Sequence, residues 1–152
     1  MTEQERTTST APSPIVVEEI YPVAPAVVWQ ALTDPTQMSQ WFFEPIESFR
    51  PEVGFETRFT VRAFEKDFVH LWKVTEVVPL HRLAYTFDYE GYHGDAGVTW
   101  ELEEVADGTR LTLTHRGVES YPRDEPAFER EAGVAGWTYF LRESLKGFLE
   151  PG

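Results

Sequence analysis

Residues 131–150 read EAGVAGWTYFLRESLKGFLE, and this stretch carries the clearest signal of the fold class. Large apolar side chains recur in it at intervals of three and four residues, at Val134, Trp137, Leu141, Leu145 and Phe148. That spacing predicts a helix with one apolar face. A helix of this length would extend about 30 Å, which is enough to lie across a whole sheet. The rest of the chain must therefore supply a sheet for it to cover.

Short segments upstream of this helix predict strands. Residues 15–21 are rich in β-branched side chains, and residues 55–62 and 98–103 alternate apolar with polar side chains. Two short helices follow the first strand, with Pro25 and Pro35 at their first positions. Nothing between the later strands looks like a crossover helix, which favours antiparallel pairing. We therefore predict an α+β fold, a curved antiparallel sheet of about six or seven strands around the C-terminal helix.

The composition narrows the classes of function. The 152 residues carry 13 Lys plus Arg against 26 Asp plus Glu, a formal charge of −13. A surface this acidic repels phosphate backbones and anionic lipids, so we expect neither a nucleic acid nor a membrane as partner. The chain has no cysteine, which excludes disulfides and thiolate chemistry. Its 4 histidines are not paired at ligand spacing, so we expect no metal and no cofactor.

The chain is expected to form one domain behind a short tail. Residues 1–14 are rich in Thr, Ser, Pro and Glu and hold no apolar run, which predicts a disordered tail rather than a signal peptide or an anchor. The 5 Trp, 6 Tyr and 11 Phe of the chain suffice for a sizeable core in residues 15–150. A cytoplasmic protein is the expectation that follows.

The chain contains a series of short motifs in a fixed order. They are Ala24-Pro25, Val28-Trp29, Ala31-Leu32-Thr33-Asp34-Pro35, Trp41, Phe49-Arg50-Pro51 with Gly54, Val77 with Pro79, Leu83 with Tyr85, Gly108-Thr109 with Leu111 to His115, and Gly136-Trp137. In this order they resemble the START-like (SRPBCC) superfamily, which has the helix-grip fold. Within it they are similar to the family of heat-shock-protein-90 ATPase activator homologues. The resemblance runs from about Ile15 to Leu149.

The resemblance implies a hydrophobic ligand. Members of the superfamily bind apolar or aromatic small molecules, lipids included, between sheet and helix, and some are cyclases, dehydratases or hydrolases. The activators carry this domain behind a separate chaperone-binding domain, whereas this chain has only residues 1–14 there. Stimulation of a chaperone is therefore not expected, although the family suggests a link to the stress response.

The predicted faces of the strands and helices converge on one interior, where we expect a cavity of about 300–1,000 Å³. An aromatic lining of this kind suits a flat hydrophobic ligand, whereas a fully packed core is the alternative. The expected ligand-binding residues are Trp41, Phe59, His70, Trp72, Tyr85, Phe87, Trp100, Leu113, His115, Trp137 and Leu141.

His70 and His115 are the weak candidates for catalysis, with Tyr85 nearby. His115 is in phase with Leu111 and Leu113, and this face should point inward. Each histidine either faces a ligand, where it orients the ligand or moves a proton, or is a buried side chain that bonds a carbonyl or solvent.

Two other functions remain open beside ligand binding. An enzyme acting on an aromatic or polyketide-like substrate would use one of these histidines as acid or base. A protein-interaction module, co-chaperone-like or a homodimer, would use an exposed apolar strip.

Overall fold

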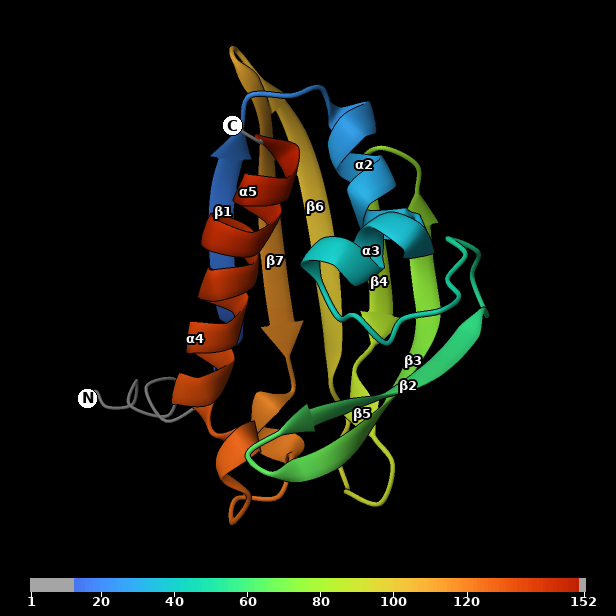
Figure 1. Ribbon diagram of the computed structural model, residues 1–152, viewed down its shortest axis with the longest axis vertical. Helices are drawn as coiled ribbons and strands as arrows, with labels where there is room; N and C mark the ends of the chain where they lie inside the picture. The colour runs from blue at the N-terminus through green and yellow to red at the C-terminus, as the bar shows by residue number, and fades with distance from the viewer. Residues whose placement is uncertain (1–12, 151–152) are drawn as a thin grey trace, which may run out of the picture.

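The computed structural model describes residues 13–150 and shows one curled sheet wrapped on a long helix (Figure 1). The predicted tail, residues 1–14, lies almost entirely outside the described residues. The sheet order is β1-β7-β6-β4-β3-β2, β5 also pairs with β3, and every pairing is antiparallel. The strands are β1 (Ile15–Tyr21), β2 (Glu56–Ala63), β3 (Lys66–Val78), β4 (Arg82–Thr86), β5 (Asp88–Tyr89), β6 (Gly97–Val105) and β7 (Gly108–Arg116). The predicted α+β helix-grip fold is confirmed.

The helices lie on the concave face of this sheet (Figure 1). The two short ones are α2 (Pro25–Thr33) and α3 (Pro35–Trp41), and the Asp34 carboxylate caps α3 by accepting from the backbone N–H of Thr36 at 3.0 Å. The C-terminal helix is α4 (Arg130–Tyr139), η3 (Phe140–Ser144) and α5 (Leu145–Leu149). Two single turns, η1 (Val118–Ser120) and η2 (Pro126–Phe128), lead into it from β7.

The middle of the C-terminal helix, η3, is a π-helical turn. The backbone N–H of Leu145 bonds the carbonyl of Phe140, five residues earlier, and the Tyr21 hydroxyl donates to the carbonyl of Leu141 at 2.6 Å. A π turn inserts one residue and so rotates the helix face that follows it. Leu141 and Leu145 are consequently both buried, and β1 is tied to the helix at this point.

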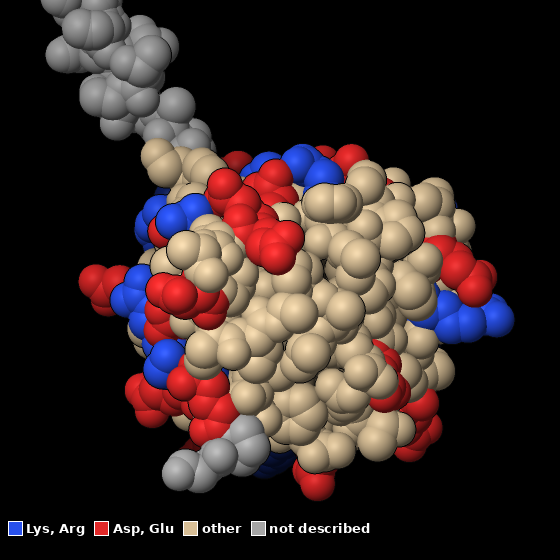
Figure 2. Space-filling model, turned by 90° about the horizontal axis from the view of Figure 1, so that it is seen from above, with Lys and Arg blue, Asp and Glu red and all other residues tan. Residues whose placement is uncertain are grey.

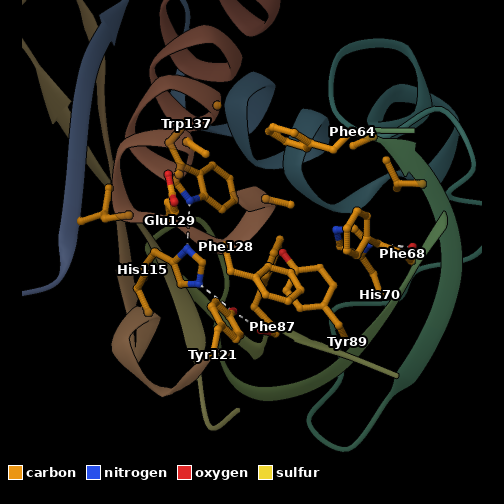
Figure 3. A pocket seen from close by; sticks show the side chains of 18 of the residues that line it. Phe64, Phe68, His70, Phe87, Tyr89, His115, Tyr121, Phe128, Glu129 and Trp137 are labelled. Carbon is orange, nitrogen blue, oxygen red and sulfur yellow. Dashed lines mark hydrogen bonds between the residues drawn. The ribbon is translucent and has the colours of Figure 1, made fainter. Parts of the chain in front are cut away.

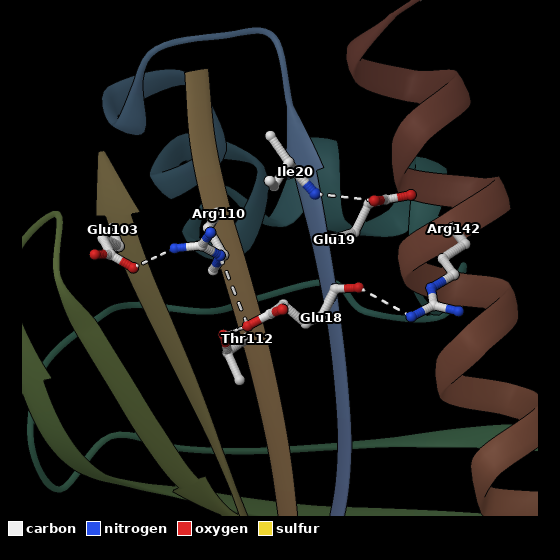
Figure 4. A network of polar contacts seen from close by, with 7 residues as sticks. All are labelled: Glu18, Glu19, Ile20, Glu103, Arg110, Thr112 and Arg142. Atoms are coloured by element: carbon white, nitrogen blue, oxygen red, sulfur yellow. Dashed lines mark hydrogen bonds and ion pairs between the residues drawn. The ribbon is translucent and has the colours of Figure 1, made fainter. Parts of the chain in front are cut away.

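The free edge of β1 is closed by side chains rather than by another strand (Figure 4). Arg142 donates to the carbonyl of Glu18 at 3.2 Å, and the Glu19 carboxylate accepts from the backbone N–H of Ile20 at 3.0 Å. On the other side, Arg110 of β7 binds Glu103 at 2.7 Å. Backbone groups engaged in this way offer a poor template for pairing with a second chain.

Aromatic side chains fill the centre of the molecule. Trp41 and Trp100 meet edge to face with ring centroids 6.0 Å apart, and Trp72 stacks on Tyr85 at 4.5 Å. The indole of Trp100 donates to the Tyr85 hydroxyl at 3.0 Å. The rings interlock, so the sheet is solidly packed where α3 covers it.

The strand that follows β3 is interrupted at Phe87. Its residues before the break form β4, and the two residues after the break form β5. At the break, the backbone N–H of Lys73 in β3 donates to the Thr86 hydroxyl at 2.9 Å, and the backbone N–H of Phe87 donates to the carbonyl of Ala96, so the β3 ladder is interrupted between β4 and β5. The first half of β3 faces β5, and this places Tyr89 directly opposite His70.

The charged side chains are unevenly spread. Figure 2 looks onto the end of the molecule where α2 lies, and there acidic and basic side chains gather around an uncharged middle. Val27 of α2 and Leu80 of the β3–β4 turn are among the exposed apolar residues. Among the described residues, no helix is long and apolar enough to cross a membrane.

Candidate functional site

A pocket of about 230 Å³ lies at the N-terminal end of α4, below the filled centre. The β2–β3 hairpin reaches across to η2 here, and Lys66 of β3 binds Glu125 at 2.8 Å, which fastens the two segments together. The exposed side chains of Phe64 and Glu129 belong to the lining, so the pocket reaches the surface between them. Its volume is below the predicted range, but it exceeds the roughly 150 Å³ of an apolar cavity that holds benzene.

The lining is almost wholly apolar and aromatic (Figure 3). Strands β2, β3, β5 and β7, the turns η1 and η2 and the helix all contribute to it. The helix contributes two glycines, and a Cβ placed on Gly136 would meet nothing within 4 Å. The lining residues are Ile15, Phe43, Val61, Ala63, Phe64, Phe68, His70, Phe87, Tyr89, His115, Val118, Tyr121, Ala127, Phe128, Glu129, Ala132, Gly133, Gly136, Trp137 and Phe140.

His115 belongs to a closed chain of hydrogen bonds on one wall (Figure 3). The indole N–H of Trp137 donates to His115 Nδ1 at 3.0 Å, so Nδ1 carries no proton. Nε2 must then carry it and donates to the Tyr121 hydroxyl at 3.0 Å, which donates in turn to the carbonyl of Phe87. Burial, aided by nearby Arg116, lowers the pKa of His115 to about 4. Both ring nitrogens of His115 are therefore occupied, and neither is free for a ligand.

His70 stands on the opposite wall, between aromatic rings. Phe59 stacks on it with centroids 4.9 Å apart, and Phe43 lies at the same distance. Nδ1 lies 3.4 Å from the carbonyl of Phe68, which can only accept, so Nδ1 carries the proton. Burial lowers the pKa of His70 to about 4, against a small opposing effect of that carbonyl. The ring is thus neutral near pH 7, with Nε2 as a bare acceptor.

Four of the predicted ligand-binding residues line the pocket: His70, Phe87, His115 and Trp137. The other seven lie outside its lining and are buried in the aromatic and aliphatic core: Trp41, Phe59, Trp72, Tyr85, Trp100, Leu113 and Leu141. The indole N–H of Trp72 has no hydrogen-bond partner among the described residues. The space lies toward one end of the sheet because α3 and its aromatic neighbours occupy the middle.

Several lining residues were not predicted. Tyr89 and Phe68 are in phase with predicted residues on their strands, Phe87 and His70 respectively, so alternation alone would have found them. Tyr121 and Phe128 lie in the irregular segment after β7, where no periodicity marks an inward side chain. Phe43 follows the end of α3 and has no pattern to identify it.

Among residues 13–150, no group of three or more His, Asp or Glu side chains is placed to hold a metal ion. The remaining histidines are both exposed, and His93 bonds the carbonyl of Ser120 through Nδ1 at 2.9 Å. The side chains that line the pocket are apolar, aromatic and neutral polar, with the carboxylate of Glu129 at the rim.

Fold and pocket together define a START-like helix-grip protein. Residues 22–150 match the family model described as "Activator of Hsp90 ATPase homolog 1-like protein". The chain belongs to this family. No curated protein matches the chain by sequence.

Solved structures agree with this assignment. Protein CV1439 from Chromobacterium violaceum superposes with a TM-score of 0.77 at 24% identity, over 93% of this chain and 100% of that one. DynU16, a putative protein in the dynemicin biosynthetic locus, gives 0.73 at 28% identity, over 93% of this chain and 49% of that one. The Aha1 dimer from Colwellia psychrerythraea gives a TM-score of 0.69 at 21% identity, over 93% of this chain and 98% of that one.

Proposed function

We propose that this protein binds a small, planar, mostly aromatic molecule in the pocket at the N-terminal end of α4. The observation that carries the proposal is a pocket of about 230 Å³ with an aromatic lining in a fold that commonly binds hydrophobic ligands. Pockets for small molecules are mainly apolar with a few placed polar groups, which describes this lining. The similar DynU16 is assigned to a biosynthetic locus, which fits a role in handling a small organic molecule.

Gly136 offers the sharpest test of this proposal. It lines the pocket, and its missing side chain leaves open space. Gly136→Leu places a side chain in that space, so we expect it to weaken binding of naphthalene or 2-naphthol at least tenfold. The matched control is Gly147→Leu, because Gly147 also lies in the C-terminal helix with open space around it but outside the pocket.

Both substitutions remove a helix glycine and should raise helix stability by up to about 1 kcal/mol. Loss of binding in Gly136→Leu alone, by titration calorimetry, therefore reports on the pocket. Equal affinity of both variants for naphthalene or 2-naphthol, or no binding of either compound by the wild type at the highest concentration that dissolves, would overturn the proposal.

The two rival functions fit the geometry less well. Catalysis through His115 lacks a free nitrogen, because Trp137 and Tyr121 occupy both. His70 keeps Nε2 as an acceptor, so catalysis through His70 stays a prediction. A homodimer is reported for the similar Aha1 protein, but pairing through the β1 edge would have to displace Arg142 and Glu19. Binding of a lipid, a role in the stress response and a cytoplasmic location remain predictions, and stimulation of a chaperone is still not expected.

A further inference from the structure

Two polar atoms in the pocket are left without partners by the protein itself. Among the described residues, no hydrogen bond engages His70 Nε2 or the Tyr89 hydroxyl. Both side chains line the pocket, and Figure 3 shows the His70 ring nitrogen and the Tyr89 oxygen directed into it. A ligand that fills the pocket displaces solvent from these two atoms, so it must supply the hydrogen bonds that they would otherwise lose.

The two atoms are held together by strand register. His70 of β3 pairs directly with Tyr89 of β5, so their side chains project from the same face. Their rings meet edge to face with centroids 4.7 Å apart. A ligand group that reaches this part of the pocket therefore meets both side chains.

The chemistry of the pair is specific. His70 Nε2 is a pure acceptor, because the proton of this neutral ring is on Nδ1, toward the carbonyl of Phe68. The Tyr89 hydroxyl both donates and accepts, and burial raises its pKa, so it stays protonated. A ligand hydroxyl satisfies both groups at once, since it donates to Nε2 and accepts from Tyr89. An ether satisfies only Tyr89, and a bare hydrocarbon satisfies neither.

An anionic ligand is disfavoured at the same place. No lysine or arginine lines the pocket, and the one charged lining residue is Glu129 at its rim. The chain carries a formal charge of −13. A carboxylate buried without a cation loses its hydration with no compensation.

From this geometry we infer that the pocket selects an uncharged aromatic molecule that carries a hydroxyl group, bound by donation to His70 Nε2 and by acceptance from Tyr89. The inference rests on the proposed function and names the chemical class of its ligand. The inference also assigns different roles to the two buried histidines. His70 recognises the ligand, whereas His115 only holds the opposite wall in place.

The test compares four ligands of one shape: 2-naphthol, 2-methoxynaphthalene, 2-methylnaphthalene and 2-naphthoate. Titration calorimetry of the wild type should show 2-naphthol binding about 3- to 10-fold more tightly than 2-methylnaphthalene, as expected for one net hydrogen bond. The methoxy compound, which can accept from Tyr89 but cannot donate to His70, should bind with an affinity between those of 2-naphthol and the methyl compound, and the carboxylate should not bind measurably. His70→Phe keeps an aromatic ring between Phe43 and Phe59, so it should still bind 2-methylnaphthalene and should reduce the preference for 2-naphthol to that shown for 2-methoxynaphthalene.

The outcomes separate the inference from the proposed function. If no neutral compound binds the wild type, the proposed function fails. The inference is wrong if 2-naphthol and 2-methylnaphthalene bind the wild type with equal affinity, or if the preference for 2-naphthol is undiminished in His70→Phe. In either case the proposed function still holds, because the pocket binds an aromatic ligand. Should His70→Phe not fold, the ¹⁵N signal of wild-type His70 Nε2 decides: it must shift on addition of 2-naphthol and stay in place with 2-methylnaphthalene.

Discussion

The centre of the sheet and its end beside β5 are built from the same kinds of side chain, yet only the end is hollow. At the centre, Trp41, Trp72 and Trp100 interlock beneath α3. At the end, Trp137, Phe87 and Tyr89 surround a space of about 230 Å³. Above the pocket the helix presents Gly136, which has open space where a side chain would be, whereas large buried side chains occupy the centre. Aromatic content alone therefore does not locate a cavity.

The largest contrast between the two regions should appear in stability. Trp100 is fully buried, so Trp100→Ala should lower the free energy of unfolding by about 3–5 kcal/mol in a urea titration. Phe64 at the pocket rim is 59% exposed, so Phe64→Ala should change the free energy of unfolding by no more than about 0.5 kcal/mol. Similar losses for both variants would erase the distinction between a filled centre and an open end.

Acid should weaken the hollow end in particular. Burial lowers the pKa of His70 and of His115 to about 4, from an ordinary value of 6.5. The unfolded chain therefore takes up protons between pH 6.5 and 4 that the folded chain does not, and stability falls as the pH falls through this window. Each histidine accounts for about 3 kcal/mol of that loss at most.

Urea titrations at several pH values check this expectation. His70→Phe removes one of the two titrating groups, so its stability should depend less steeply on pH between 6.5 and 4 than that of the wild type. The same slope in the variant and the wild type would show that His70 is not held neutral by burial.

A smaller loss of stability is expected when a hydrogen bond in the wall of the pocket is removed. Tyr121→Phe leaves the Nε2–H of His115 and the carbonyl of Phe87 without their partner, which should cost about 1–3 kcal/mol. Tyr139→Phe is the matched control, because Tyr139 is exposed and should tolerate the change. If the two variants are equally stable, the chain from Trp137 to Phe87 contributes little to holding the wall.

Sequence reasoning predicted most of the fold and part of the site. Periodicity identified the C-terminal helix, and Pro35 marked the start of α3, because these signals are local. The pocket is not local. Its position depends on how deeply Trp41 and its neighbours fill the middle and on the β3–β5 pairing that places Tyr89 opposite His70. Tyr121 and Phe128 come from turns without a repeating pattern, so only the folded chain shows that they face inward.

The central claim is that ligands enter the hollow end and leave the centre undisturbed. The indole N–H signals of the tryptophans in a ¹⁵N–¹H correlation spectrum test it most directly. Trp137 lines the pocket and bonds His115, whereas the indole of Trp41 bonds the carbonyl of Ala31 in the core. On saturation with 2-naphthol, the account predicts a large shift for Trp137 and almost none for Trp41. A shift of Trp41 as large as that of Trp137, or no shift of either signal, would contradict it.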